Sequence, residues 1–331
     1  MESRATAFVM QYAPLPPGVE LDVKPIHGGL ESTVARATVK GNVPHAPGLP
    51  RRFVVKELRG AQRREADVYE LLWRRLEHPP AARLLGHTET DDASYLYLED
   101  VRRLSAWPWR DHQASAAVCR ALARVHDAPD IAAALPPWDY EAELARSADE
   151  TLRVALMVRH GAAPVWRRLG DLRRVVTGLV EMRRRLLSGG ATLIHGDVHP
   201  GNVIVRSGGG PYRIVLIDWA RARLGSPLED VASWLHSLGC WDVEARRRHD
   251  SLLAVYLQAR HPPIRFDAAV RANYWLASAS NGLSGAIRYH LVMLGNPAVT
   301  GKARADSQRA LDEWQRVIRG AAAALATPRA C

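Results

Sequence analysis

Apolar and polar residues recur at two different periods along the chain, and the change between them divides it into two regions. In the first region apolar positions tend to alternate with polar ones, as in residues 34–39. Alternation at every second residue is typical of strands with one buried face. Strands are therefore predicted within residues 21–55 and over 93–98, and an apolar stripe predicts one helix over 61–76.

Beyond the Pro- and Trp-rich residues 104–110, apolar positions follow the 3.6-residue spacing of helices. A further helix is expected to begin at Ser226-Pro227, because serine caps a helix and proline suits its first position. One stretch, residues 193–219, is different: two apolar runs joined by a Gly-rich turn predict a hairpin. The predicted helices cover 112–126, 141–159, 165–187, 243–258, 266–280, 283–294 and 303–325.

The length and composition agree with this division. The chain has 331 residues, enough for two sub-domains with their own cores, and its apolar share of 47% is ordinary for a globular protein. No apolar run is long enough to cross a bilayer, and no signal-peptide pattern is present. Three distant cysteines do not suggest disulfides or a zinc site. We expect a cytoplasmic protein without a membrane partner.

The formal net charge of +10 raises the question of nucleic-acid binding. The positive charge is almost all arginine, spread in pairs and triplets such as Arg183-Arg184-Arg185. Most of these lie in predicted helices, where we interpret them as solvated faces. We therefore predict no nucleic-acid partner.

Chemically useful side chains gather at the ends of the predicted hairpin. His195, Asp197 and Asn202 form the pattern H-x-D-x-x-x-x-N before its first run, and Asp218 follows its second run. The hairpin can bring an Asp, an Asn and a second Asp to one point. Such a set suits phosphoryl transfer, in which one carboxylate handles the acceptor hydroxyl while an amide and another carboxylate hold magnesium.

The N-terminal region offers weaker signals. The pair Gly28-Gly29 between two strands, with Ser32 nearby, allows close approach of backbone N–H groups to a phosphate, but an ordinary hairpin turn has the same sequence. Lys56 ends a predicted strand and is one of only four lysines in a chain rich in arginine. It is either a compact charge at a site or a solvated lysine. Glu65 and Glu70 are candidate partners, and Glu65 is preferred.

Taken together, these residues resemble the aminoglycoside phosphotransferase and choline kinase family, the small-molecule branch of the protein-kinase-like fold. The main carriers are HGDVHPGNVIV, IDW and SPLEDVASW; weaker ones are HGGLES, FVVKEL, READVYELL, YLYLEDV and ALARVH. The resemblance implies an α+β bilobal fold. Residues 1–101 would form a small antiparallel-sheet N-lobe that includes the hinge, and residues 102–331 a larger helical C-lobe with the catalytic loop and acceptor site.

The resemblance also implies a role for each matching position. Asp197 would be the catalytic base, and Asn202 and Asp218 would bind Mg²⁺. Lys56, positioned by Glu65, would contact the phosphates of ATP, although GTP is not excluded.

The remaining matches imply cofactor binding or support. The turn of Gly28, Gly29 and Ser32 would cover the phosphates. Glu99 to Val101 would be the hinge that meets the adenine, while His195 and Asp230 would brace the catalytic loop. Trp219 and Ala220 depart from the Phe and Gly of protein kinases and imply a less mobile magnesium segment.

The acceptor is the least determined part. Tyr274, Trp275, Asn281 and Arg288 are candidate acceptor-binding residues, although the aromatic ones also suit a helix core. We expect an O-phosphotransferase that acts on a hydroxylated small molecule, most of all an antibiotic, an aminoglycoside being one option. The alternatives are a metabolic kinase for a sugar, choline-like or amino-acid acceptor, and a non-catalytic nucleotide-binding pseudokinase. The oligomeric state is not predicted.

Overall fold

The computed structural model describes residues 1–10, 20–26, 33–41, 50–102, 111–128, 134–160, 163–206, 212–241 and 243–327. The predicted phosphate turn of Gly28, Gly29 and Ser32 lies outside these residues, so its role stays a prediction. The chain forms two compact units. Unit 1 comprises Met1–Ala106, Ala133–Pro136 and Ile204–Ala222, and unit 2 comprises Trp107–Ala132, Pro137–Val203 and Arg223–Cys331.

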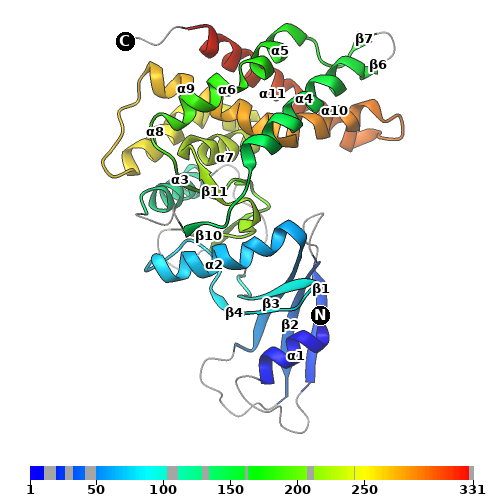
Figure 1. The fold of residues 1–331 in the computed structure, drawn as a ribbon, viewed down its shortest axis with the longest axis vertical. Coiled ribbons are helices and arrows are strands. Elements are labelled where there is room, and N and C mark those ends of the chain that lie inside the picture. The colour runs from blue at the N-terminus through cyan, green and yellow to red at the C-terminus, as the bar shows by residue number, and fades with distance from the viewer. Residues whose placement is uncertain are drawn as a thin grey trace. The chain divides into compact units, whose positions relative to one another are not determined.

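Unit 1 is built on a five-stranded sheet in the order β1-β2-β3-β5-β4, with every neighbouring pair antiparallel (Figure 1). Two α-helices, the 3-10 turns η1 and η3 and most of a hairpin complete its described residues. The strands are β1 (Glu20–Ile26), β2 (Thr33–Lys40), β3 (Arg52–Arg59), β4 (Leu84–Glu89) and β5 (Ala93–Glu99), followed along the chain by the hairpin strands β9 (Val203–Arg206) and β10 (Arg213–Leu216). The helices are α1 (Glu2–Met10), η1 (Gly60–Arg63), α2 (Arg64–Arg75) and η3 (Trp219–Arg221).

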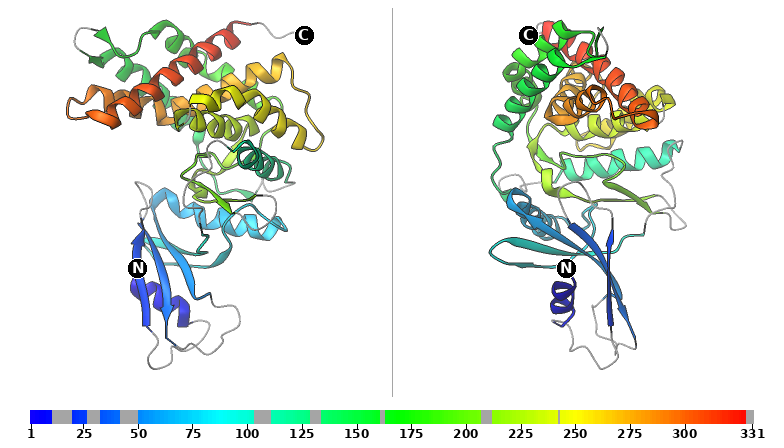
Figure 2. Two further views of the ribbon diagram at one scale, coloured as in Figure 1. Left: turned by 180° about the vertical axis from the view of Figure 1, so that it is seen from behind. Right: turned by 90° about the vertical axis from the view of Figure 1, so that its right-hand side faces the viewer.

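Because side chains alternate along each strand, the two faces of this sheet carry different kinds of residue. Helix α1 lies against one face of the sheet (Figures 1 and 2). On that face Phe8 of α1 stacks on Tyr97 with ring centroids 3.9 Å apart, and Phe53 and Val55 join the same buried cluster. Because successive side chains of a strand point to opposite faces, Lys56 emerges on the other face, where it meets α2. The apolar face thus fixes the strand that carries Lys56.

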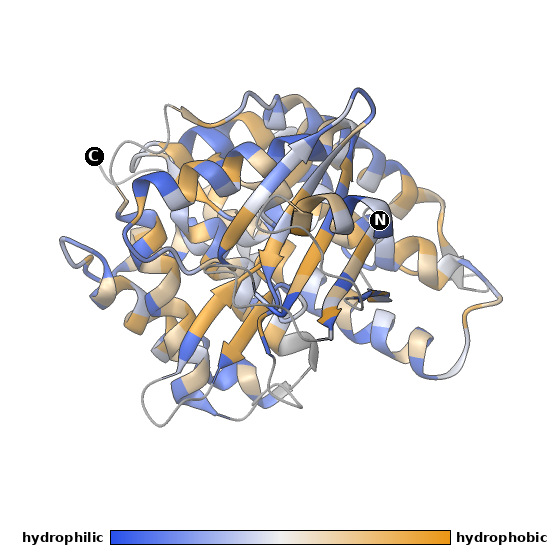
Figure 3. Cartoon of the chain, turned by 90° about the horizontal axis from the view of Figure 1, so that it is seen from below, coloured by the Kyte–Doolittle hydropathy of each residue, from blue (hydrophilic) through white to orange (hydrophobic). Residues whose placement is uncertain are grey.

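Unit 2 is mainly helical. Figure 3 shows helices that carry both hydrophobic and hydrophilic positions, as expected for amphipathic helices around a core. Its helices are α3 (His112–His126), α4 (Tyr140–Met157), α5 (Leu169–Thr177), α6 (Leu179–Leu187), α7 (Pro227–Trp241), η4 (Val243–Arg248), α8 (His249–Ala259), α9 (Ala268–Asn281), η5 (Gly282–Ala286), α10 (Ile287–Gly295) and α11 (Gly301–Ala326). Its short strands are β6 (Arg159–His160), β7 (Ala163–Pro164), β8 (Thr192–Ile194) and β11 (Arg223–Gly225).

Close approach of α9 and α11 depends on a small residue in the longer helix. A Cβ atom added at Gly320 of α11 would lie 2.7 Å from the Trp275 ring, which belongs to α9. The indole therefore packs directly on the backbone of α11. Arg316, one turn earlier, lies over the same ring at 5.0 Å from its centroid.

The predicted elements are largely present, with identifiable exceptions. The helix predicted over 112–126 and the helix start at Ser226-Pro227 are confirmed. The helix predicted over 165–187 is wrong as a single element: it begins later, at Leu169, and Gly178 separates α5 from α6. Neither α1 nor β4 was predicted. The lobe boundary between residues 101 and 102 stays a prediction, and Ile204–Ala222 belongs to unit 1.

In the part of the chain that the structure describes, no helix combines the length and the apolar character needed to cross a membrane.

Candidate active site

In unit 1, Lys56 joins two carboxylates. Its Nζ donates to Glu65 Oε2 at 2.7 Å and to Asp218 Oδ1 at 2.8 Å, and both Lys56 and Glu65 are buried. Burial by itself lowers the pKa of Lys56, but the two carboxylates outweigh it and raise the pKa above its ordinary value, so the ammonium keeps its charge. The predicted partner Glu65 is confirmed, since Glu70 lies beside Arg74 instead.

The backbone around Asp218 is held in an unusual conformation. Asp218 has φ of 66°, the only positive φ among the described residues other than glycine. This region costs L-residues about 1–2 kcal/mol. It is stabilised by the residue that follows: the Trp219 backbone N–H donates to Glu65 Oε1 at 3.1 Å, and its indole donates to the Leu216 carbonyl at 3.2 Å. Glu65 therefore fixes both Lys56 and the Asp218 turn.

Arg64 is a second anchor of this turn, and no local sequence pattern predicts this role. Its guanidinium donates to the carbonyl oxygens of Ala220 at 2.9 Å, Ala222 at 2.7 Å and Pro136 at 3.1 Å. The high arginine content of the chain conceals such a residue, because nothing in its neighbours distinguishes a guanidinium that binds backbone from one that faces solvent.

The predicted hinge follows β5. The Glu99 N–H already donates to the Arg83 carbonyl at 2.9 Å, so contact with a base would need another group of this residue. Val101 is buried. Between them Asp100 accepts a hydrogen bond from Arg36 Nε at 3.0 Å, which ties the segment back to β2. Adenine binding by Glu99 and Val101 stays a prediction.

In unit 2, β8 leads directly into the predicted catalytic loop, which closes on itself. Gly196 has φ of 80°, a left-handed conformation that favours glycine. The Asp197 N–H donates to Nδ1 of the buried His195 at 3.3 Å. Asn202 Nδ2 donates to the Asp197 carbonyl at 3.0 Å and to its Oδ2 at 3.2 Å. Asp197 is thus oriented, while its side chain stays 42% exposed and accessible to a reactant.

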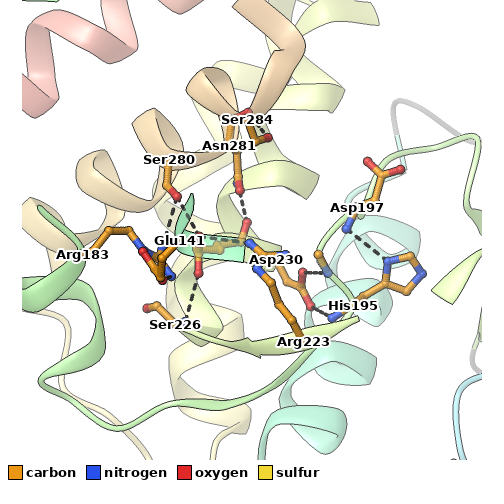
Figure 4. A network of polar contacts seen from close by, with 12 residues as sticks. Glu141, Arg183, His195, Asp197, Arg223, Ser226, Asp230, Ser280, Asn281 and Ser284 are labelled. Carbon is orange, nitrogen blue, oxygen red and sulfur yellow. Dashed lines mark hydrogen bonds and ion pairs between the residues drawn. The ribbon is translucent and has the colours of Figure 1, made fainter. Parts of the chain in front are cut away.

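Asp230 anchors this loop from the first turn of α7. Its Oδ2 accepts the His195 N–H at 2.7 Å and its Oδ1 accepts the Gly196 N–H at 2.8 Å (Figure 4). Burial raises the pKa of Asp230, but His126 at 3.1 Å, His195 and the Gly196 N–H outweigh burial and hold the pKa below its usual range. Asp230 thus contacts the backbone of the loop at His195 and Gly196, and the supporting role of His195 and Asp230 stays a prediction.

His199 is a loop residue that the sequence analysis did not single out. Its Nδ1 accepts the Gly201 N–H at 3.0 Å, and its Nε2 lies 3.7 Å from Asp197 Oδ2. A Cβ at Gly201 would come within 2.6 Å of the His199 ring, so a larger residue there would displace the imidazole from this position. Its position as the second histidine of HGDVHPGN, two residues after Asp197, is the sequence feature that could have indicated this contact.

The predicted magnesium ligands have suitable donor atoms. Asn202 directs its Nδ2 to Asp197, which leaves the amide oxygen for a cation, and Asp218 offers a carboxylate. Hard oxygen donors of this kind suit Mg²⁺, which usually keeps several waters and takes phosphate oxygens. Among the described residues no group of three or more His, Cys, Asp or Glu could hold a metal by itself. The oxygen donors of Asn202 and of Asp218 are each of the kind that Mg²⁺ prefers, and their binding of the ion stays a prediction.

The four candidate acceptor residues have other partners in the structure. Tyr274 is buried and lies 5.7 Å from Trp275, ring to ring. Asn281 Nδ2 donates to the Glu229 carbonyl at 2.6 Å, and Arg288 pairs with Glu150 of α4. Only Tyr274 and Trp275 contact each other among these described residues. Acceptor binding by the four stays a prediction.

Comparisons with known proteins show the family. The model of the phosphotransferase enzyme family matches residues 22–274. A search of the curated proteins found no match. This chain therefore belongs to the phosphotransferase enzyme family.

Solved structures show the same fold at low identity. Spectinomycin phosphotransferase APH(9)-Ia, crystallised with ADP and spectinomycin, is 12% identical with a TM-score of 0.58, covering 98% of both chains. A choline/ethanolamine kinase family protein from Mesorhizobium loti is 16% identical with a TM-score of 0.58, covering 98% of this chain and 99% of that one. An aminoglycoside phosphotransferase from Alicyclobacillus acidocaldarius is 15% identical with a TM-score of 0.59, covering 96% and 94%.

The class of protein follows from the family and the fold. The predicted α+β protein-kinase-like fold is confirmed. The chain is an enzyme, a small-molecule phosphotransferase of the aminoglycoside phosphotransferase and choline kinase type, with a hydroxyl group as acceptor.

Proposed function

We propose that this enzyme transfers the γ-phosphoryl group of ATP to a hydroxyl of a small molecule, with Asp197 as the base. The observation that carries the proposal is the geometry of the loop. Asp197 is half exposed, its carboxylate is oriented by Asn202, and the backbone before it is held by the charged Asp230. A base of this kind orients the acceptor hydroxyl and takes its proton as the bond to phosphorus forms.

The remaining roles concern the nucleotide. Lys56, which keeps its charge between Glu65 and Asp218, would contact the phosphates of ATP. Asn202 and Asp218 would bind Mg²⁺, which when bound offsets the charge of the transferring phosphoryl group. Use of ATP also supports the cytoplasm as the site of action; GTP remains an alternative nucleotide.

For the acceptor, we propose a hydroxylated antibiotic, inactivated by phosphorylation. Spectinomycin phosphotransferase, an enzyme of this fold, was crystallised with an antibiotic. A polycationic aminoglycoside needs several carboxylates that are not already paired. In the C-terminal helices Asp250 pairs with Arg271, Asp306 with Lys302, and Glu313 with arginines. This pairing favours an acceptor with few positive charges.

A metabolic kinase is the second candidate. The similar protein from Mesorhizobium loti is named as a choline/ethanolamine kinase family protein, and the motifs of the loop serve that chemistry equally. A third alternative, a pseudokinase that binds nucleotide without transfer, is disfavoured by the presence of Asp197, Asn202, Asp218 and Lys56.

The deciding experiment compares wild type with Asp197→Asn over a panel of acceptors, with MgATP as donor. The panel contains polycationic aminoglycosides, spectinomycin, neutral macrocyclic antibiotics, choline, ethanolamine, sugars and nucleosides. ADP release and mass spectrometry of the acceptor measure transfer. We expect one class to be phosphorylated by the wild type, with kcat at least about 100-fold lower in the variant.

Asp312→Asn is the matched control, because Asp312 is an exposed carboxylate far along the chain on α11. It should keep full activity. Transfer that persists in Asp197→Asn would show that another group is the base. A panel without any Asp197-dependent product would favour the pseudokinase.

A further inference from the structure

The buried Glu229 stands next to Asp230 in the first turn of α7, and the proposed function gives it no task. Its Oε1 accepts hydrogen bonds from Arg183 Nη1 at 2.8 Å, from Ser280 Oγ at 2.8 Å and from Arg223 Nη2 at 3.2 Å. Figure 4 shows these side chains converging from separate elements on the same turn. One carboxylate therefore joins α6, α9 and β11.

The second carboxylate oxygen holds the start of α7. Glu229 Oε2 accepts the Ser226 N–H at 3.1 Å, which is the glutamate half of a capping box. The fit is tight, because a Cβ added at Gly225 would lie 2.8 Å from Oε2. The Glu229 carbonyl is occupied as well, since it accepts Asn281 Nδ2 at 2.6 Å.

The negative charge of Glu229 matters because both arginines are buried, at 5% exposure for Arg183 and 4% for Arg223. Arg183 has a second carboxylate, Glu141 of α4, at 2.8 Å, but that side chain is 54% exposed. Arg223 lies 3.6 Å from the centroid of the Tyr140 ring. Buried cations are stable only when paired, so Glu229 is the internal counter-charge of both guanidinium groups.

Asp230 carries the effect of this clamp to the catalytic loop. Glu229 and Asp230 are joined by one planar peptide unit, so a displacement of the first residue is passed to the second. The first of the two, Glu229, is fastened to the helices, and the second accepts the His195 and Gly196 N–H groups that precede Asp197. A shift at Glu229 would therefore displace the anchor of the loop.

The neighbouring strands provide a second connection. Arg223, which donates to Glu229, lies on β11, and its Cα is paired with that of Ile194 on β8. The next residue after β8 is His195. The arginine thus fastens the strand beside the one that delivers the loop.

We propose that Glu229 is a positioning residue for phosphoryl transfer, which sets the place of the catalytic loop through Asp230 and ties it to α4, α6 and α9. This rests on the proposed function, because it takes Asp197 in that loop as the base. Glu229 contacts no reactant in this role. Its loss therefore lowers kcat more than it changes the KM for ATP.

The competing explanation is that the cluster contributes only to stability. Glu313 of α11 offers a matched comparison in the same unit. It is equally buried, and its carboxylate pairs with Arg246, Arg316 and His236. It makes no described contact with the loop. Glu229→Gln and Glu313→Gln each remove one buried negative charge shared by two arginines.

The test uses the full chain with MgATP and water as the acceptor, so that no acceptor needs to be known. Basal ATP hydrolysis gives kcat and the KM for ATP, and hydrogen exchange without nucleotide follows the amides of His195 and Gly196. In Glu229→Gln we expect kcat to fall at least about tenfold with KM changed less than about threefold. We also expect exchange of the two amides to become roughly tenfold faster or more.

Glu313→Gln should lose a comparable amount of thermal stability and keep the wild-type kcat and loop exchange. The proposal is overturned if Glu229→Gln behaves like Glu313→Gln in both measurements. Asp197→Asn tests the proposed base separately from the role of Glu229. If this variant keeps the wild-type kcat, Asp197 is not the base. The exchange rates of the His195 and Gly196 amides still test whether Glu229 positions the loop.

If Glu229→Gln does not fold, Arg183→Lys decides. Lysine keeps the positive charge but lacks the planar fork that spans Glu141 and Glu229. We expect a smaller fall in kcat with faster exchange at His195 and Gly196. A folded Arg183→Lys enzyme with wild-type values for both would overturn the proposal.

Discussion

The carboxylate of Glu65 makes two different contacts, one with each oxygen. Substitution by glutamine removes its charge and keeps its shape. One oxygen pairs with Lys56 and the other accepts the Trp219 N–H. We predict that Glu65→Gln lowers the free energy of unfolding by about 3 kcal/mol, because the buried ammonium loses a partner. The KM for ATP should rise about tenfold or more, since Lys56 and the Asp218 turn lose their common support.

Glu70→Gln is the control on the same helix. Glu70 is partly exposed beside Arg74 at 3.5 Å, and exposed pairs contribute little. Denaturant unfolding and ATP kinetics should leave this variant within about 0.5 kcal/mol of wild type. Equal effects at the two positions would contradict the assignment of Glu65.

A pH effect on stability is expected from His249. Burial, followed by the neighbouring His236, lowers its pKa to about 3. An unfolded histidine has a pKa of about 6.5. Between these values the unfolded chain binds a proton that the folded chain does not, so stability falls as the pH decreases from about 6.5 towards 3, by about 1.4 kcal/mol per pH unit.

The measurement compares urea unfolding of wild type and His249→Gln at pH 7.5 and 5.5. The wild type should lose about 1.4 kcal/mol more than the variant over this interval. Equal losses would show that His249 is protonated in the folded enzyme or that its burial has no energetic cost.

At the scale of elements, the junction between β11 and α7 leaves no room for a larger residue at Gly225. A Cβ at Gly225 would lie 2.4 Å from Ile194 Cδ1 and 2.8 Å from Glu229 Oε2. We predict that Gly225→Ala costs about 1–3 kcal/mol of unfolding free energy through overpacking. Thermal unfolding of the purified variant measures this loss.

The same substitution at Gly170 is expected to stabilise the protein, in contrast to Gly225→Ala. Gly170 lies in α5 with no atom within 4 Å of the added Cβ. Alanine there should stabilise by about 0.4–1 kcal/mol, because it restricts the unfolded chain and favours helix. A loss at Gly170 as large as at Gly225 would show that packing is not the cause.

The elements that could be predicted are those whose own residues define them. The helix α3 has both a capping Asp111 and a continuous apolar stripe, and α7 has a capping serine and proline. In contrast, α1 is a short helix that depends on the fit of Phe8 against Tyr97, which no local pattern reveals. The strand β4 contains Gly86 and polar residues, so its alternation is weak.

For the site, local signals identified the residues but not their connections. Lys56 and Glu65 were linked correctly because strand end and helix start are close in sequence. The arginine triplet was interpreted as a solvated face, which fits the mainly exposed Arg184 and is wrong for the buried Arg183. Its partner Glu229 is 46 residues away, so only the three-dimensional structure shows the pair.

At the scale of the whole molecule, many of the positively charged side chains form ion pairs with carboxylates of the same chain. Described arginines in both units pair with carboxylates, for example Arg36 with Asp100 and Arg260 with Asp127. Pairing of this kind weakens the field that a nucleic acid would meet, even though the net charge is +10.

We therefore predict that the enzyme does not remain on immobilised double-stranded DNA at about 0.15 M salt, with a log–log salt dependence corresponding to fewer than about three phosphate contacts. Elution in a salt gradient measures both. A steep dependence with retention well above that salt concentration would contradict the interpretation of the arginines as internally paired or solvated.

The short segment after Asp218 limits the ways in which this enzyme can be regulated. Trp219 is fully buried, η3 spans only Trp219–Arg221, and β11 begins at Arg223. This segment has no surplus length to swing away or to carry a modifiable residue. We therefore expect no control of this enzyme by a flipping activation loop after Asp218.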